Sequence, residues 1–215
     1  MIVLYPNDPS THFLSDICKV ISNSENIDVY FRDKDTLTYE EIISIVEKSH
    51  LSRLILYLGH GTSTEIYYFG TENVITSEIA QQIFKGKKLI LLACYSSEFL
   101  RTLNKQFYSA IGFGNILTSR AELEPRDYNE YNHEDFKCIS LFREKLVKLF
   151  IQSLTEARAL NSSFLQFNNS LKLRINKVIS ECSISEDKTD KLLGKLMFDL
   201  KTEIKLFGDP HASLF

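Results

Sequence analysis

The sequence contains little that would hold a fold together covalently or through a metal. Its four cysteines, Cys18, Cys94, Cys138 and Cys182, are widely separated, with no Cys-x-x-Cys pair and no Cys/His cluster at zinc spacing. We therefore expect neither a disulfide framework nor a structural zinc site, and no cofactor. A functional cysteine in this chain must be special through its reactivity.

Runs of one charge are also missing. The formal net charge is −3, and no block of five or more like charges occurs. The chain therefore lacks the basic surface that binding to a phosphate backbone requires, and it contains no glycine-rich phosphate loop of either standard type. Nucleic acid is not the partner that this composition predicts.

Long apolar segments are absent as well. No run reaches membrane-spanning length, and residues 1–6 lack the cationic start and long apolar stretch of a signal peptide, so we expect a cytoplasmic protein without membrane contact. The 215 residues are 44% hydrophobic, which is ample for a core. We expect a single domain over 1–215.

Short apolar runs predict the strands. Residues 2–5 are continuously apolar, and so are 53–58 and 88–93 after the leading Arg53 and Lys88; such runs are typical of fully buried parallel strands. Weaker strands are expected at 27–31 and 109–113. Helical segments are expected between them, at 11–22, 38–48, 76–84 and 96–105. This alternation predicts an α/β fold, a three-layer sandwich with a mostly parallel sheet of about six strands and helices on both faces.

The pattern changes after about residue 127. Residues 128–177 contain no glycine or proline and show apolar residues at helical spacing, which predicts one or two long helices. A loop is expected at 183–190, and then a helix, or a helix followed by a short strand, over 191–206. The domain would thus consist of a sheet-forming catalytic core, 1–126, and a mainly helical part, 127–215.

His60 stands at the end of an expected strand, between two glycines, in Leu54-Ile-Leu-Tyr-Leu-Gly-His60-Gly61. Glycine on both sides lets the backbone turn tightly and approach a ligand closely. A capped or core histidine is the alternative interpretation.

Cys94 ends another expected strand and leads into an expected helix, in Lys88-Leu-Ile-Leu-Leu-Ala-Cys94-Tyr95-Ser96. A thiol at a helix N-terminus has its pKa lowered below the usual value of about 8.5, which favours the nucleophilic thiolate. The alternative is a small apolar residue that finishes a buried strand. Ser96 and Ser97 are interpreted as helix N-cap residues rather than nucleophiles.

The two signals are more informative together. Consecutive strands of such a sheet usually lie side by side, which would bring His60 and Cys94 to neighbouring strand ends. A cysteine activated by a histidine is an arrangement for acyl transfer, and the backbone N–H groups of Gly61 and Cys94 are candidate oxyanion donors.

These motifs resemble the caspase-like cysteine peptidases, the superfamily of caspases, separases and gingipains, and in particular its bacterial CHAT-domain branch. Leu-Gly-His60-Gly61 and Leu-Ala-Cys94-Tyr95-Ser96 carry the similarity, which extends from about residue 51 to 121. The resemblance implies Cys94 as nucleophile, His60 as general acid/base, and Gly61 with Cys94 as oxyanion donors. Leu92 stands where many metacaspases have an aspartate, so specificity for basic residues is only partly supported.

Substrate-binding residues are expected in two loops. Asp8 follows the first strand, where relatives place a specificity residue, although a turn before Pro9 also explains it. Glu122 and Glu124 lie in the loop 118–127, an expected pocket wall whose mixed charges are equally compatible with a solvated surface. His133 and its neighbouring carboxylates are interpreted as a solvated helix start rather than a metal site.

The sequence therefore predicts a cysteine endopeptidase that acts on a protein substrate through a Cys94–His60 dyad. The small catalytic domain suggests regulation by an activating protein partner or by processing, as in bacterial defence systems with CHAT-like proteases. Two alternatives stay open: a catalytically idle caspase-like binding or scaffold module, and a thiol amidase or acyltransferase acting on a small molecule.

Overall fold

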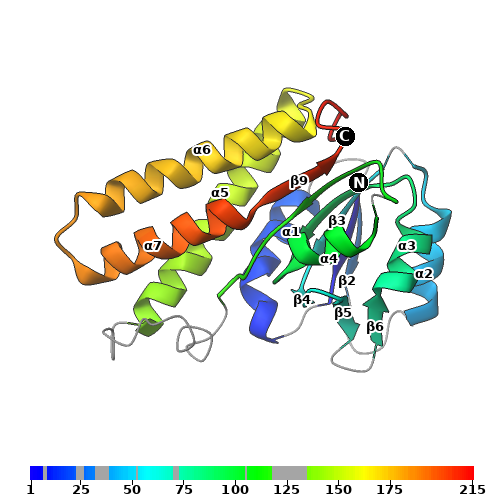
Figure 1. Ribbon diagram of the computed structural model, residues 1–215, viewed down its shortest axis with the longest axis horizontal. Coiled ribbons are helices and arrows are strands. Elements are labelled where there is room, and N and C mark those ends of the chain that lie inside the picture. Colours follow the sequence, from blue (N-terminus) through cyan, green and yellow to red (C-terminus); the bar gives the residue numbers. More distant parts are fainter. Residues whose placement is uncertain are drawn as a thin grey trace.

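A six-stranded sheet forms the centre of the computed structural model, which describes residues 1–6, 9–22, 27–31, 39–51, 53–69, 73–104, 106–117 and 135–215 (Figure 1). The strand order is β2-β1-β3-β7-β8-β9, and every pairing is parallel except that of β8 with β9. The strands are β1 (Ile2–Tyr5), β2 (Asp28–Phe31), β3 (Leu54–Leu58), β7 (Lys88–Leu92), β8 (Ser109–Gly112) and β9 (Lys205–Gly208). The predicted α/β class and mostly parallel sheet are confirmed.

The apolar runs form the middle strands of this sheet. Both faces of the sheet are covered there, so residues on either face of these strands are apolar. All residues of β1, β3 and β7 are buried, and their side chains alternate between two hydrophobic cores. In β3, for example, Leu56 and Leu58 face one core and Ile55 and Tyr57 face the other. Burial of each large apolar side chain contributes roughly 1.5–3 kcal/mol to stability.

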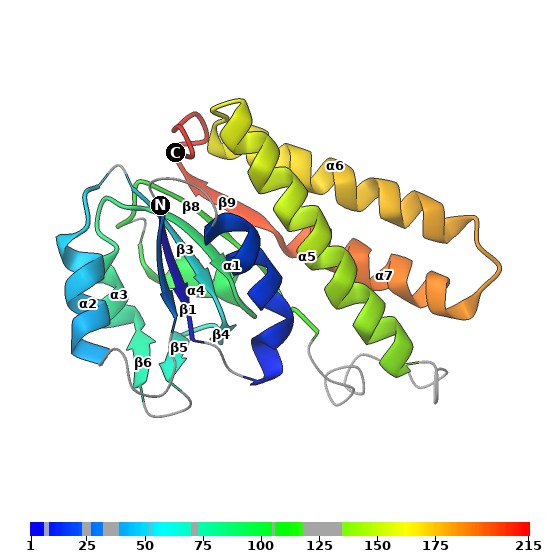
Figure 2. The same cartoon turned by 180° about the vertical axis from the view of Figure 1, so that it is seen from behind.

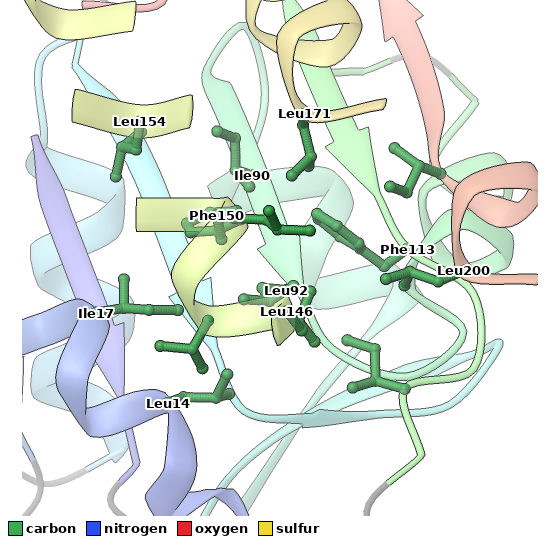
Figure 3. Packing of buried hydrophobic residues seen from close by; sticks show 14 of the residues in the cluster. Leu14, Ile17, Ile90, Leu92, Phe113, Leu146, Phe150, Leu154, Leu171 and Leu200 are labelled. Atoms are coloured by element: carbon green, nitrogen blue, oxygen red, sulfur yellow. The ribbon is translucent and has the colours of Figure 1, made fainter. Parts of the chain in front are cut away.

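Helices cover both faces of the sheet (Figures 1 and 2). The core on one side, which we call the α5-side core, joins Leu58 and Leu92 to α1, α5, α6 and α7; the α2-side core joins Tyr57 and Leu91 to α2, α3 and α4. Figure 3 shows members of the α5-side core, among them Phe150 of α5 and Ile90 and Leu92 of β7. The helices are α1 (Ser15–Ser22), preceded by the 3₁₀ helix η1 (Pro9–Leu14), α2 (Tyr39–Lys48), α3 (Ser77–Ile83), α4 (Ser96–Thr102), α5 (Asp135–Ala159), α6 (Phe164–Ser183) and α7 (Lys188–Glu203).

A second, small antiparallel sheet was not expected from the sequence. It consists of β4 (His60–Gly61), β5 (Glu65–Phe69) and β6 (Asn73–Thr76), and it leads directly from β3 to α3. Its first strand has only two residues, too few for an alternating pattern to be recognised. Its importance is that it carries His60 and Gly61.

The C-terminal part contributes a strand as well as helices. The expected long helical segment is two helices, because Asn161 adopts a positive φ of 47° and Ser163 caps α6 through a capping box with Gln166. The expected loop at 183–190 is shorter, since Asp187 caps α7, which begins at Lys188. After α7, β9 returns to the edge of the central sheet, as the helix-then-strand alternative predicted. No helix in the described ranges is long and apolar enough to cross a bilayer.

Candidate active site

His60 and Cys94 each follow one of two neighbouring strands. The parallel pair β3 and β7 ends in register at Leu58 and Leu92, and Gly59 N–H donates to the carbonyl of Leu92 at 3.2 Å. Both residues therefore lie at the carboxyl edge of the sheet, two positions beyond paired residues. The predicted adjacency of these two strand ends is confirmed.

Gly61 is the residue that brings the two segments into contact. A β-carbon on Gly61 would lie 2.8 Å from the carbonyl oxygen of Cys94 and 3.3 Å from the β-carbon of Ala93. No real β-carbon approaches a backbone oxygen so closely, so only glycine allows the strand after His60 to pass this near to Cys94.

The hairpin of β4 and β5 also orients the Gly61 N–H group. Thr62 N–H donates to the carbonyl of Glu65 at 2.8 Å, and Gly61 is opposite Ile66 at the next position of the ladder. Because hydrogen-bonded and non-hydrogen-bonded pairs alternate in an antiparallel ladder, Gly61 N–H points away from β5. The Gly61 N–H group is therefore not used in the pairing with β5.

Tyr57 fixes the backbone of His60 from beneath. The hydroxyl of this buried β3 side chain lies 2.8 Å from the carbonyl oxygen of His60 and is also in contact with the carbonyl oxygen of Tyr67, so its single hydrogen is shared between the two acceptors. One phenol thus holds both strands of the hairpin that carries His60.

The imidazole of His60 contacts the segment that follows a third strand, β1. Its Nε2 atom lies 2.6 Å from Oγ of Ser10, which belongs to η1, the segment that follows β1. Since β1 is the neighbour of β3 in the sheet, its C-terminal segment reaches the same edge. His60 is half-buried, whereas Ser10 is exposed.

The thiol of Cys94 donates a hydrogen bond to the carbonyl of Ile116 at 3.2 Å. Cys94 is half-buried and packs against the α5-side core. Leu14 of η1 belongs to the same core. Cys94 and η1, whose Ser10 contacts His60, therefore pack on the same face of the sheet.

The turn around Cys94, residues 93–97, is bound to the loop after β8, residues 113–117, which we call the β8 loop. Tyr95 N–H donates to the carbonyl of Gly114 at 2.9 Å, and Ser97 N–H donates to that of Phe113 at 2.8 Å. Tyr95 has a positive φ of 54°, an uncommon conformation for a residue with a side chain. The turn after Cys94 is therefore sharp, and its shape depends on the β8 loop.

The expected roles of Ser96 and Ser97 as N-cap residues are wrong. Tyr95 occupies the N-cap position of α4, without a side-chain cap, and both serines are buried. Ser96 Oγ donates to the carbonyl of Leu91 at 2.5 Å and accepts from Phe113 N–H at 2.8 Å. It connects the Leu91 carbonyl of β7 to the Phe113 N–H that follows β8.

Glu203, the last residue of α7, supports the β8 loop from behind. Its Oε2 accepts the Asn115 N–H at 2.9 Å, and its side chain fills the space where a β-carbon of Gly114 would stand. The loop that receives the Cys94 thiol is thus attached to the helical C-terminal part.

The other three cysteines are buried. Burial raises the pKa of the Cys18 thiol to about 12, and burial is also the main cause of the raised pKa of Cys182. Cys94 is the only half-buried cysteine of the four. Within the described ranges no group of three His, Cys, Asp or Glu side chains could hold a metal ion.

Asp8, Glu122 and Glu124, assigned to substrate binding, and His133 lie outside the described residues.

The sequence analysis also missed three residues that contact the site. Ser10 could have been suspected, because the segment after the first strand meets the same sheet edge, but Tyr57 and Glu203 carry no distinguishing pattern.

Comparisons with known proteins add no identity to this geometry. No family model matches the chain, and a search of the curated proteins returns no match. The functional argument therefore depends on the residues at the carboxyl edge of the sheet.

Proposed function

We propose that this chain is a cysteine endopeptidase of the caspase-like type, with Cys94 as nucleophile and His60 as general acid/base. The observation that carries the proposal is the contact of Gly61 with the Cys94 carbonyl at the ends of two strands in register. It supports the proposal because it brings the segment that carries the half-buried His60 against the turn that carries the half-buried Cys94, at the edge where parallel sheets collect their chemistry.

The reaction would proceed in two acyl-transfer steps. His60 accepts the thiol proton of Cys94 while the sulfur attacks the scissile carbonyl, and the N–H groups of Gly61 and Cys94 stabilise the oxyanion. Collapse of the tetrahedral intermediate expels the amine, which takes the proton from His60, and leaves a thioester on Cys94. Water then attacks the thioester, with His60 as base, and releases the acid and the free thiol.

A caspase-like fold is the finer assignment within the α/β class. It is supported by the two motifs at successive strand ends and by the mostly parallel order of the sheet. The bond from the Cys94 thiol to the Ile116 carbonyl adds a reason for regulation, because a carbonyl acceptor stabilises the protonated thiol. We therefore propose that a protein partner or processing raises the peptidase activity by displacing this bond, as a protease of a bacterial defence system would require, while His60 already assists part of the ionisation of Cys94 in the isolated chain.

The same bond favours one rival. A thiol that permanently donates to a carbonyl would belong to a binding or scaffold module that retains Cys94 for packing. This rival requires no chemistry from His60, so the two functions differ in whether His60 changes the reactivity of Cys94.

The test is a cleavage profile on a diverse peptide library, with and without lysate of the source cells, analysed by mass spectrometry. The proposal expects new peptide termini with the wild-type protein that are absent with Cys94→Ser and His60→Ala. Hydrolysis of small amides alone would favour the thiol amidase. No cleavage under any condition, together with no covalent adduct on Cys94 from an electrophilic peptide, would contradict the proposal.

A further inference from the structure

We propose that Ser10 is the positioning residue of the dyad and that it holds His60 in the tautomer whose Nδ1 atom accepts the proton of Cys94. The inference rests on the proposed function. It is carried by the distance of 2.6 Å between Ser10 Oγ and His60 Nε2, which links segments fifty residues apart in the chain.

Ser10 is set in place by buried contacts on either side of it. Tyr5, the last residue of β1, donates its hydroxyl hydrogen to the carbonyl of Thr11 at 3.3 Å, and both side chains are buried. Leu14, at the end of the same 3₁₀ helix, is buried in the α5-side core. The backbone at Ser10 is therefore anchored, although its side chain reaches an exposed edge.

The contacts with Tyr57 and Ser10 act on different parts of His60. The Tyr57 hydroxyl donates to the backbone carbonyl of His60, and Ser10 Oγ is within hydrogen-bond distance of the Nε2 atom of its ring. The first contact acts on the backbone and does not set the rotation of the ring about its side-chain bonds. The second determines which edge of the ring is turned towards the rest of the site.

The chemistry follows from the two nitrogens of imidazole. A neutral imidazole carries one proton, and the hydrogen bond of one nitrogen determines the tautomer of the other. If Nε2–H donates to Ser10 Oγ, the lone pair is on Nδ1, where it can accept the thiol proton. After the transfer Nε2–H still donates to Ser10, so the same contact serves both protonation states. This is the part that an acidic or amide side chain takes in other nucleophile–histidine sites.

The first measurement is independent of activity. In nitrogen-15 spectra of the histidine side chains, His60 is identified by its loss in His60→Gln. The proposal expects a predominantly Nε2–H tautomer in the wild type and in Ser10→Thr, which keeps the hydroxyl. It expects a mixture of tautomers in Ser10→Ala. Ser22→Ala removes an exposed hydroxyl that donates to the carbonyl of Lys19 within α1; it is the matched control and should match the wild type.

The second measurement is the pH dependence of Cys94 alkylation by iodoacetamide, followed by peptide mapping. Loss of one hydrogen bond to the ring should slow the reaction at neutral pH about threefold to tenfold in Ser10→Ala. The midpoint of the profile should move to higher pH, and Ser10→Thr should restore it. Circular dichroism and the urea midpoint show that each variant is folded.

The outcomes separate this inference from the proposed function. If His60→Ala slows alkylation of Cys94 but Ser10→Ala changes neither the tautomer nor the profile, the dyad stands and the role of Ser10 is wrong. If His60→Ala has no effect, the proposed function fails, and the role of Ser10 fails with it, whatever the tautomer. A predominantly Nδ1–H tautomer in the wild type would also overturn the inference.

Discussion

The carbonyl oxygen of Cys94 lies 2.8 Å from the position that a β-carbon of Gly61 would occupy. The neighbouring atom is backbone, so it cannot move aside as the end of a long side chain could. The hairpin that carries His60 can therefore approach the turn that carries Cys94 this closely only because residue 61 has no side chain.

Substitution of Gly61 by alanine should therefore damage the site more than its surroundings. We expect Gly61→Ala to separate the two segments, to lower the free energy of unfolding by about 1–3 kcal/mol and to slow alkylation of Cys94. Urea unfolding and alkylation kinetics measure the two effects. Ser63→Ala, at an exposed position of the same hairpin, is the control. Equal stability and equal Cys94 reactivity in both variants would show that the contact does not constrain the site.

Glu203 tests the dependence of the Cys94 turn on the helical part. Glu203→Ala removes the acceptor of Asn115 N–H, and Asn115 is buried, so we expect a loss of about 1–3 kcal/mol in stability. Glu203→Gln keeps an oxygen acceptor of the same length and should lose less. If alkylation of Cys94 changes in Glu203→Ala but not in Glu203→Gln, the β8 loop transmits the effect. Unchanged alkylation in both variants would mean that the Cys94 turn keeps its shape without Glu203.

Cys18 provides a prediction on stability against pH. Burial raises the pKa of its thiol from 9.0 to about 12, so the folded protein binds this proton more tightly than the unfolded chain does. Its contribution to stability is therefore complete below about pH 8.5 and is lost as the pH rises towards 12.

The measurement is the free energy of unfolding from denaturant titrations between pH 7 and pH 10.5. Cys18→Ala leaves a cavity and lowers stability at every pH, but above pH 9 its profile should fall less steeply than that of the wild type. The expected difference in slope is at most about 1.4 kcal/mol per pH unit. Parallel profiles would show that the Cys18 thiol does not ionise on unfolding in this range.

The sheet could be predicted because its middle strands are apolar on both faces. Residues 2–5, 54–58 and 88–92 are almost entirely apolar and are followed by proline, glycine or a helix, so their positions and their parallel orientation follow from the sequence. The small sheet could not be predicted in the same way. Its first strand, His60–Gly61, is defined by its pairing with β5, and a pairing of two residues leaves no pattern in the chain.

The site divides along the same line. His60, Gly61 and Cys94 are at strand ends, and strand ends can be located from the apolar runs that precede them. Ser10, Tyr57 and Glu203 act through hydrogen bonds made by the fold, and these depend on which elements become neighbours. The interpretation of Ser96 as a helix cap was wrong for the same reason. Its hydroxyl donates to the carbonyl of Leu91 and accepts from Phe113 N–H, and these two residues come together only in the folded sheet.

The most direct test of the account is the rate at which a small electrophile alkylates Cys94 at pH 7, compared between the wild type and His60→Ala. Cys18, Cys138 and Cys182 are buried and serve as internal references in the same peptide map. The account predicts that Cys94 reacts fastest of the four and that His60→Ala slows it about tenfold or more, to the rate of an unassisted thiol. Equal rates for Cys94 in the two proteins would contradict the claim that His60 and Cys94 form a catalytic pair.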